Sequence, residues 1–257
     1  MSIFIKLKRL GSDQTGSRRL YSMIIMRIIN KIKSYTCRFS NRHFVSYLKL
    51  HGIEIGEGTK FRPFSTEIDI TRPSLVKIGK NCYFNKQFVL LTHDWVTRVF
   101  IHSGREFLPS SGRVIIGDNV ITGQNVMVLK GVTIGDNVFI GANSVVTKDI
   151  PSNSIAVGVP CRVIMSLDEF YERRKSQSID EALDYAKSIQ ERFHRKPKVT
   201  DFREEFVLYV DGDKMEHYPE IKELMRFQLG PSYDDYVKNH KAKYANFDEF
   251  LKAAGIS

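Results

Sequence analysis

Histidine is the side chain in this sequence best suited to acid–base chemistry near neutral pH. One of the seven histidines, His93, lies in the stretch LLTHDW, directly before a segment of charged and bulky residues. Imidazole, with an ordinary pKa of about 6.5, can remove the proton of a weakly acidic hydroxyl as that hydroxyl becomes a nucleophile. His102 lies inside the segment and is the alternative base. Asp94 could orient the ring, although adjacent residues on a strand face opposite ways.

A six-residue repeat surrounds His93. Reading in sixes from Ile116 gives IGDNVI, TGQNVM, VLKGVT, IGDNVF, IGANSV and VTKDIP. Positions one and five are mostly aliphatic, position two is often glycine, and positions three and four favour Asp, Asn or Gly. A chain that turns a corner every six residues has this period, because Gly and Asn accept the positive φ values that corners need. Three such sides close a coil, and stacked coils bury a continuous aliphatic column.

The same frame occurs upstream and is interrupted once. Ile55 opens IGEGTK and FRPFST, and Ile78 opens IGKNCY, FNKQFV and LLTHDW, so the coils are expected to begin near Gly52. The frame is lost after Trp95, which predicts a loop at residues 96–110. Long loops that leave a rigid scaffold often carry function, and His93 lies where this one begins. Without that position, His93 would be an ordinary surface histidine.

The run VIIGDNVITGQNVMVLKGVTIGDNVFIGANSVVTKDIPSNSIAVGVPCRVI resembles the C-terminal coils of the hexapeptide-repeat acyltransferase superfamily. It resembles galactoside and maltose O-acetyltransferases and acetyltransferases of polysaccharide biosynthesis, over residues 52–165. The resemblance implies a mainly β fold, a left-handed parallel β-helix, and a homotrimer that binds acetyl-CoA between subunits. It also implies that His93 is the general base that helps a sugar hydroxyl attack the thioester, while a backbone amide stabilises the oxyanion.

The resemblance assigns binding roles to particular positions. Residues expected to contact acetyl-CoA are Gln124, Gly141, Ala142, Thr147, Lys148 and Arg162. Residues expected to contact the acceptor are Asn85, Asp94 and Trp95. The Arg162 guanidinium suits the nucleotide phosphates, whereas Gly141 and Ala142 are equally well explained by turn chemistry. Two positions depart from the family pattern: Ile121 replaces the usual Trp, and Met165 replaces a common second arginine.

Composition excludes several classes of protein. With 257 residues and 42% hydrophobic side chains, the chain can bury a core in one or two domains. The net charge of +10 comes entirely from residues 1–50, since the other 207 residues hold 28 charges of each sign, and nucleic acid is not an expected partner. Three dispersed cysteines argue against a disulfide framework and a zinc site. His93 and His102 alone are a poor ligand set, so no metal is expected.

The N-terminal segment, residues 1–50, contains a predicted amphipathic basic helix over residues 22–39. Two interpretations remain open: peripheral contact with an anionic membrane, and a cap on the open end of the β-helix. The apolar stretch Met23–Ile29 is far shorter than the roughly 20 residues of a membrane span, and no signal-peptide pattern precedes it. A cytoplasmic location is expected, with contact at the inner face of the plasma membrane under the first interpretation.

A C-terminal helical extension, residues 166–257, is expected to follow the β-helix domain of residues 51–165. Ser166 precedes one helical stretch, and Ser178 with Glu181 predicts a capping box that opens a second helix. An aromatic core is predicted from Phe202, Phe206, Tyr209, Phe227, Tyr233, Tyr236, Phe247 and Phe250. The extension resembles those of acyltransferases encoded in polysaccharide gene clusters.

Two classes of function compete. The first is an acetyl-CoA-dependent acetyltransferase that modifies a sugar hydroxyl of a bacterial surface polysaccharide, O-antigen or capsule, or its precursor. Its variant is N-acetylation of a nucleotide-linked amino sugar. The second class is a non-catalytic or metal-dependent β-helix protein. Release of free thiol from acetyl-CoA separates the two classes.

Overall fold

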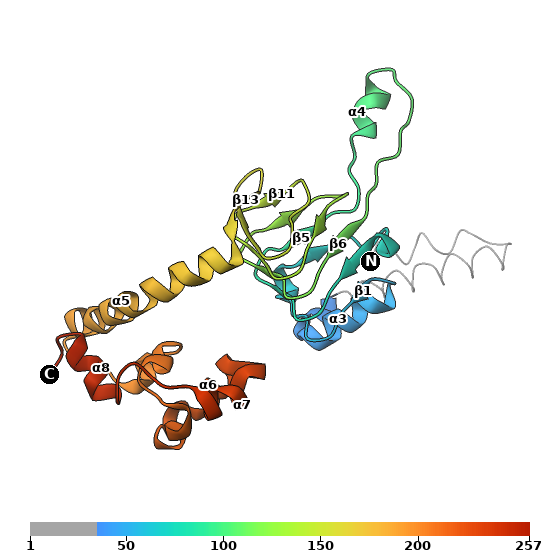
Figure 1. The fold of residues 1–257 in the computed structure, drawn as a ribbon. Helices are drawn as coiled ribbons and strands as arrows, with labels where there is room; N and C mark the ends of the chain where they lie inside the picture. Colours follow the sequence, from blue (N-terminus) through green and yellow to red (C-terminus); the bar gives the residue numbers. More distant parts are fainter. Residues whose placement is uncertain (1–34) are drawn as a thin grey trace, which may run out of the picture. The chain divides into compact units, whose positions relative to one another are not determined.

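The computed structural model describes residues 35–257, which form two compact units that adjoin in the sequence between Phe170 and Tyr171. The first unit contains the predicted coils, and the second is helical (Figure 1). Most of the helix predicted for residues 22–39 lies outside the described residues. No helix among residues 35–257 combines the length and the apolar character needed to cross a membrane.

The first unit is a left-handed parallel β-helix with three flat sides, as the six-residue repeat predicted. Side A consists of β1 (Glu54–Ile55), β3 (Val76–Ile78), β6 (Val114–Ile116) and β9 (Thr133–Ile134). Side B consists of β4 (Tyr83–Phe84), β7 (Ile121–Thr122), β10 (Val138–Ile140) and β12 (Ser154–Val157). Side C consists of β2 (Glu67–Ile68), β5 (Val89–Leu90), β8 (Met127–Val128) and β11 (Val145–Val146).

Position one of the repeat points inward on every side. On side A, the strand register stacks Ile55, Ile78, Ile116 and Ile134 in one column. All four isoleucines are at most 5% exposed. Full burial of such a side chain contributes about 1.5–3 kcal/mol, so each column stabilises the stack over its whole length.

The corners have two kinds of position, and the expectation that both asparagine and glycine supply positive φ is confirmed at one of them. The positive φ values belong to position four, as at Asn119 (57°), Asn137 (55°) and Gly131 (78°). Glycine at position two is needed for space: a Cβ on Gly117 would lie 2.2 Å from Oδ1 of Asp136 and 2.8 Å from the carbonyl carbon of Gly135. The asparagines also bond along the stack, since Nδ2 of Asn119 donates to Oδ1 of Asn137 at 2.9 Å.

A helix covers the first coil. The 3-10 helix η2 (Cys37–Phe39) leads into α3 (Asn41–Leu50), whose Phe44 and Leu48 join the core of the β-helix. The Phe44 ring packs edge-on against Phe61 at 5.6 Å, and the side chain of Asn41 accepts a hydrogen bond from the backbone N–H of Phe61 at 2.7 Å. Within the described residues, this end is therefore capped by η2 and α3, of which the predicted helix over residues 22–39 includes only η2.

Short helices interrupt the coils at three places. They are η3 (Pro63–Ser65), η4 (Pro73–Leu75) and α4 (Thr97–His102). The predicted loop over residues 96–110 therefore contains a short helix, α4, at the position labelled in Figure 1. Its base is held by an antiparallel bridge between His93 and Ser111.

The last coil ends with β13 (Arg162–Ser166), antiparallel to β12, and continues into α5 (Leu167–Phe193). A capping box opens α5: Ser166 Oγ accepts from the Glu169 N–H at 3.1 Å, and Glu169 Oε2 accepts from the Ser166 N–H at 2.7 Å. The predicted second box at Ser178 and Glu181 is wrong. No glycine or proline interrupts α5, and Ser178 donates to the Lys175 carbonyl within the helix at 3.3 Å.

The second unit packs its own aromatic core. After α5 come η5 (Val199–Asp201), η6 (Glu205–Leu208), η7 (Gly212–His217), η8 (Pro219–Ile221), α6 (Lys222–Leu229), η9 (Gly230–Ser232), α7 (Tyr233–Asn239) and α8 (Phe247–Ala253). Phe202, Phe206 and Phe250 are at most 1% exposed. Phe227 is 74% exposed, contrary to the prediction. It lies two residues from the buried Met225 and therefore on the opposite side of α6.

Candidate active site

His93 forms a hydrogen-bonded pair with Asp69 from the preceding coil. Nδ1 of His93 lies 2.6 Å from Oδ2 of Asp69, and the two side chains are 20% and 4% exposed. Asp69 directly follows β2 and His93 follows β5, and these strands are neighbours on side C. The parallel register therefore brings together two residues that are 24 positions apart in the sequence.

Asp69 accepts hydrogen bonds from several neighbours. The Thr71 hydroxyl donates to Oδ1 at 2.6 Å and the Thr71 N–H donates to the same oxygen at 2.9 Å. The Thr92 hydroxyl and backbone N–H donate to Oδ2. Burial opposes ionisation of Asp69, but the hydrogen bonds from Thr71, Thr92 and His93 outweigh it and hold the pKa below its ordinary value. Asp69 is consequently a carboxylate at neutral pH.

The charge on Asp69 determines the tautomer of His93. A carboxylate only accepts hydrogen bonds, so Nδ1 must carry the hydrogen and donate it to Asp69. The neutral ring then keeps a lone pair on Nε2, which has no hydrogen-bond partner among residues 35–257. This arrangement is the one a general base requires, because the carboxylate also stabilises the imidazolium that forms when Nε2 takes a proton.

His93 lines a cavity of about 270 Å³ at the base of the loop. Its other walls include Arg72 from the segment between β2 and β3, Trp95 and Arg98 from the beginning of the loop, and Phe107 from the returning segment of the loop. Trp95 is 65% exposed, and the guanidinium of Arg98 lies 5.3 Å from the centre of its ring. The cavity thus combines a base, an aromatic face and two cations.

Asp94 holds the base of the loop and does not orient His93. Oδ2 of Asp94 lies 2.5 Å from Nζ of Lys130 in the next coil and accepts from the Ser110 hydroxyl at 2.9 Å. Oδ1 accepts from the Val96 N–H at 3.0 Å. The hydrogen bond from Lys130 is the largest influence on this carboxyl, and together with the others it lowers the pKa of Asp94 to about 2. Asp94 still lines the cavity, as does Trp95.

The alternative base, His102, lies at the end of α4 and is exposed. Among the described residues that line the cavity, His93 is the only histidine. No carboxylate hydrogen-bonds to His102 within residues 35–257. The cavity therefore contains His93 and not His102.

The residues expected to bind acetyl-CoA are divided between two corners. Gln124 and Ala142 lie one coil apart where side B turns into side C, since the Asn143 N–H donates to the Gln124 carbonyl at 2.9 Å. Gly141 lies beside them, and Arg162 pairs with Val157 in the following layer of side B. Thr147 and Lys148 follow β11 at the end of side C, the corner from which His93 also projects.

Asn85, expected to contact the acceptor, does not line the cavity of His93 in the single chain. It follows β4 at the corner between sides B and C, where its N–H donates to the Thr122 hydroxyl at 3.2 Å and its Oδ1 accepts from the Lys86 N–H at 2.9 Å. Asn85 is therefore on the same corner as Gln124, one corner away from His93.

Three residues of the site were missed by the sequence analysis: Asp69, Arg72 and Arg98. Asp69 was hidden because the six-residue frame shifts by one residue in that coil, where the inward residue after Phe61 is Ile68. Among residues 35–257, no group of three or more His, Cys, Asp or Glu side chains is arranged to hold a metal ion.

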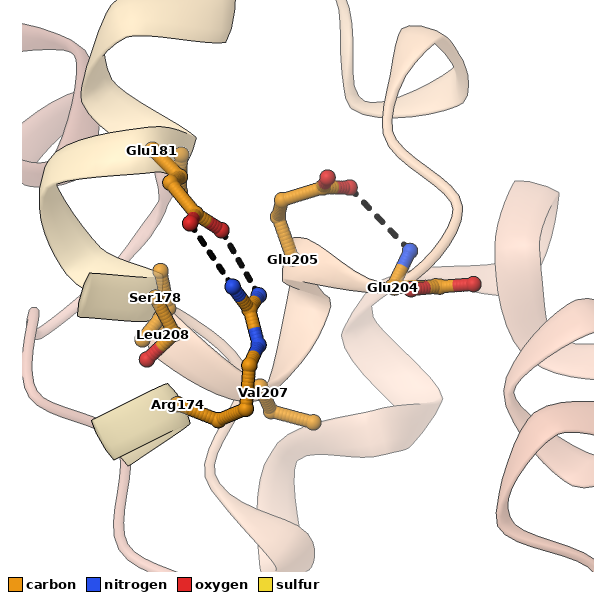
Figure 2. A pocket seen from close by; sticks show the side chains of 8 residues that line it. Arg174, Ser178, Glu181, Glu204, Glu205, Val207 and Leu208 are labelled. Carbon is orange, nitrogen blue, oxygen red and sulfur yellow. Dashed lines mark hydrogen bonds and ion pairs between the residues drawn. The ribbon is translucent and has the colours of Figure 1, made fainter. Parts of the chain in front are cut away.

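The second unit carries another hollow, of about 320 Å³, shown in Figure 2. Its charges are largely satisfied internally. The guanidinium of Arg174 is bound to Glu181 by two hydrogen bonds of 2.7 and 2.6 Å, and the Glu205 carboxylate accepts from the Glu204 N–H at 3.1 Å. No histidine or cysteine is among the described residues that line it. The cavity of His93, where a buried carboxylate is hydrogen-bonded to the imidazole, is the candidate active site.

Comparison with known proteins identifies the family of the β-helix. The family model of the bacterial transferase hexapeptide (six repeats) matches residues 113–148. Protein CapG of Staphylococcus aureus is 39% identical over 138 residues, which cover 54% of this chain and 77% of CapG. The putative acetyltransferase YvoF of Bacillus subtilis (strain 168) is 30% identical over 151 residues, which cover 59% of this chain and 81% of YvoF.

Among solved structures, a maltose O-acetyltransferase from Clostridium difficile 630 matches with a TM-score of 0.39 and 27% identity, over 56% of this chain and 87% of that one. The two sequence relatives, matched over more than two thirds of their length, show the class of protein. The chain belongs to the bacterial hexapeptide-repeat transferases. Within that family it is an enzyme of the acyltransferase class.

Proposed function

We propose that the chain transfers an acetyl group from acetyl-CoA to a sugar hydroxyl of a bacterial surface polysaccharide, O-antigen or capsule, or of its precursor. The observation that carries the proposal is the His93–Asp69 pair at the wall of a cavity that also offers an aromatic face. A hydroxyl needs a base to attack a thioester, and the tautomer set by Asp69 leaves Nε2 of His93 ready to accept the proton. Trp95 provides an apolar surface of the kind on which a sugar ring stacks.

His93 and Asp69 have separate roles in the proposed reaction. Acetyl-CoA supplies the acyl group as a thioester, which is attacked by the acceptor oxygen. His93 takes the hydroxyl proton at Nε2 as the new C–O bond forms, and the imidazolium returns it to the sulfur as the C–S bond breaks. Asp69 holds the ring and stabilises its positive charge. Such a base contributes about 10²–10⁴ to the rate.

The coenzyme residues fit a pantetheine arm that approaches the backbone closely. Gly123 and Ala142 stack so tightly that a Cβ on Gly123 would lie 2.5 Å from the Ala142 nitrogen. Gly123 and Ala142 add little side-chain bulk beside Gln124, which supports a close approach of the pantetheine arm to the backbone there. Arg162 is exposed at the same end of the β-helix and is proposed to meet the nucleotide phosphates.

A homotrimer is part of the proposal. In one chain, His93 and Thr147 lie on one corner while Asn85 and Ala142 lie on another, so a neighbouring subunit is needed to bring both sets to one groove. The exposed apolar side chains of the loop, among them Val99 (65%) and Phe107 (65%), are proposed to pack against that neighbour. Light scattering at micromolar concentration should give three times the chain mass, and a monomer would contradict the model of the groove.

Thiol release from acetyl-CoA tests the reaction. The purified chain is incubated with acetyl-CoA and a panel of oligosaccharides and nucleotide sugars, and products are identified by mass spectrometry. Acetyl esters are removed by mild alkali whereas acetamides persist, so the same samples separate O-acetylation from the alternative, N-acetylation of an amino sugar. Absence of thiol release with every acceptor would favour the non-catalytic class.

The proposed location is the cytoplasm, with contact between residues 22–39 and the inner face of the plasma membrane. The support is the spacing of isoleucines and basic residues in that segment. Deletion of residues 1–34 tests it without removing Phe44 or the other contacts of the cap. Loss of sedimentation with phosphatidylglycerol vesicles, with thiol release retained, is the expected result. Unchanged sedimentation would contradict the proposal.

A further inference from the structure

We propose that the acceptor is an acidic sugar, whose carboxylate or phosphate group is bound by Arg72 and Arg98 beside the catalytic imidazole. This inference rests on the proposed function and narrows its substrate class. Both arginines line the cavity of His93. Neither forms an ion pair with any carboxylate among residues 35–257.

The carboxylates near the cavity are already committed to other partners. Asp69 is 4% exposed and accepts hydrogen bonds from Thr71, Thr92 and His93. Asp94 is neutralised by Lys130 at 2.5 Å. The two guanidinium groups are therefore the uncompensated charges among the residues that line the cavity. An anion is the ligand chemistry that such a cavity favours.

Arg72 is tied to the network that orients the base. Its Nη1 donates to the Thr71 hydroxyl at 3.3 Å, and that hydroxyl donates to Asp69 Oδ1 at 2.6 Å. The other oxygen of the same carboxylate holds the His93 ring. One buried carboxylate thus positions both the cation and the base, so an anion bound by Arg72 has a defined placement relative to Nε2.

The second arginine, Arg98, belongs to α4 in the loop. Its guanidinium stacks over the Trp95 ring at 5.3 Å. Stacking satisfies the face of a guanidinium but leaves its N–H edges available, and these edges match the two oxygens of a carboxylate or phosphate. A sugar ring on Trp95 with its acidic group between the two arginines would present a neighbouring hydroxyl to His93.

The phosphates of acetyl-CoA are the other source of an anion at this place. They are less well matched, because Arg162 and the small residues near Ala142 lie on a different corner from Arg72. The two sources make different kinetic predictions. An acceptor anion affects the KM of the acceptor, whereas a coenzyme phosphate affects the KM of acetyl-CoA.

Direct binding can be measured without turnover, because the chain contains one tryptophan, Trp95, and it lines the cavity. Tryptophan fluorescence is titrated with glucuronate, glucose 1-phosphate and glucose. The acidic sugars should bind at least about tenfold more tightly than glucose. Arg72→Gln and Arg98→Gln should each weaken acidic-sugar binding by about 10- to 100-fold, the value of a hydrogen-bonded charge pair.

Arg105→Gln is the matched control. Arg105 lies in the same loop as Arg98, and its replacement removes the same charge, but it lies outside the cavity and donates to Ser103 at 2.6 Å. The affinity of the Arg105→Gln variant for glucuronate should stay within about twofold of the wild type. Equal binding of glucose and both acidic sugars, or equal losses in all three variants, would overturn the inference.

Kinetic measurements of acetyl transfer distinguish a failure of this inference from a failure of the proposed function. With an acidic acceptor, Arg72→Gln should raise the acceptor KM and leave the KM of acetyl-CoA unchanged. If Arg72→Gln instead raises the KM of acetyl-CoA, the inference of an acidic acceptor is wrong, and the proposed acetyl transfer is unaffected. Binding of glucuronate without thiol release for any acceptor would overturn acetyl transfer and leave the anion site supported.

Discussion

The regular coils and the interrupted corner of the same β-helix use their polar side chains in different ways. In residues 114–157, polar groups pair with their equivalents one coil away, as in the hydrogen bond between Asn119 and Asn137. At the interrupted corner, Asp69 instead meets Thr92 and His93. In the regular coils, polar side chains form the hydrogen bonds that stabilise the stack. Titratable side chains are available for chemistry where the repeat is interrupted.

Replacement of His93 is the strongest test of this difference between the regular coils and the interrupted corner. His93→Ala should lower kcat by about 10²–10⁴, because the base acts in the transition state. The free energy of unfolding should change little, since the imidazole is not part of the aliphatic columns. Thiol release and chemical denaturation measure the two quantities on the same sample.

His102→Ala is the control for that experiment. The residue is exposed at the end of α4, so its replacement should leave most of the activity. An inactive His102→Ala together with an active His93→Ala would show that the loop supplies the base.

Asp69→Asn should reduce kcat by about 10- to 100-fold, the usual effect of removing a partner that orients a functional histidine. The amide keeps the shape of the side chain but no longer stabilises the imidazolium or selects the tautomer. Asp94→Asn is the comparison, because Asp94 contacts Lys130 and not the ring. If Asp94→Asn is the more damaging change to kcat, with folding intact, the assignment of Asp69 is wrong.

Gly117→Ala should lower the free energy of unfolding and leave kcat unchanged, the opposite of the result expected for His93→Ala. The new Cβ would lie 2.2 Å from Oδ1 of Asp136, and overpacking of this kind costs about 1–3 kcal/mol of stability. The folded fraction should keep its kcat. Gly104→Ala is the comparison in the loop, because Gly104 has a φ of +75°, which is unfavourable for alanine, but no atom lies within 4 Å of the added Cβ, whereas Gly117 has no positive φ. A loss of stability no larger than that of Gly104→Ala would contradict the packing argument.

The smallest effect concerns acid stability. The folded-state pKa of Asp69 is lowered, so its contribution to stability is fully present above the unfolded pKa of about 3.9 and is lost as the pH falls toward the folded pKa. Between about pH 4 and pH 2.5, the wild type should therefore lose stability more steeply than Asp69→Asn, by at most about 1.4 kcal/mol per pH unit. Urea unfolding at several pH values measures the slopes. Identical slopes would contradict the lowered pKa.

The coils could be predicted from the sequence because their determinants are local and periodic. Ile116, Ile134 and their equivalents recur in one frame, and each is buried. The entrance of the loop and the position of His93 followed from the same frame, since both lie where it ends. Glycine at position two was recognised as a corner residue, but its reason, contact with the next coil, depends on a neighbour that one hexapeptide does not contain.

The partners of His93 depend on register between coils, which the repeat alone does not determine. The coil that contains Asp69 carries η3 and η4, and these insertions change the number of residues between equivalent positions. Arg72 and Arg98 belong to irregular segments that no period describes. The capping box at Ser178 failed for a related reason: a local signal was present, but no glycine or proline in the preceding residues ends α5 before it.

The loop also affects the order in which the coils are expected to form. Within the regular coils, stacked groups such as Asp118 and Asp136 are 18 residues apart, whereas Lys80 and Asp118, on either side of the loop, are 38 apart. Doubling the length of a closed segment adds about 0.6 kcal/mol of chain entropy to its closure. Assembly is therefore expected to start among the coils of residues 114–157, which depend on shorter-range contacts, and to reach the coil of His93 later. The hydrogen bond between His93 and Asp69 would then form only after the regular coils have folded.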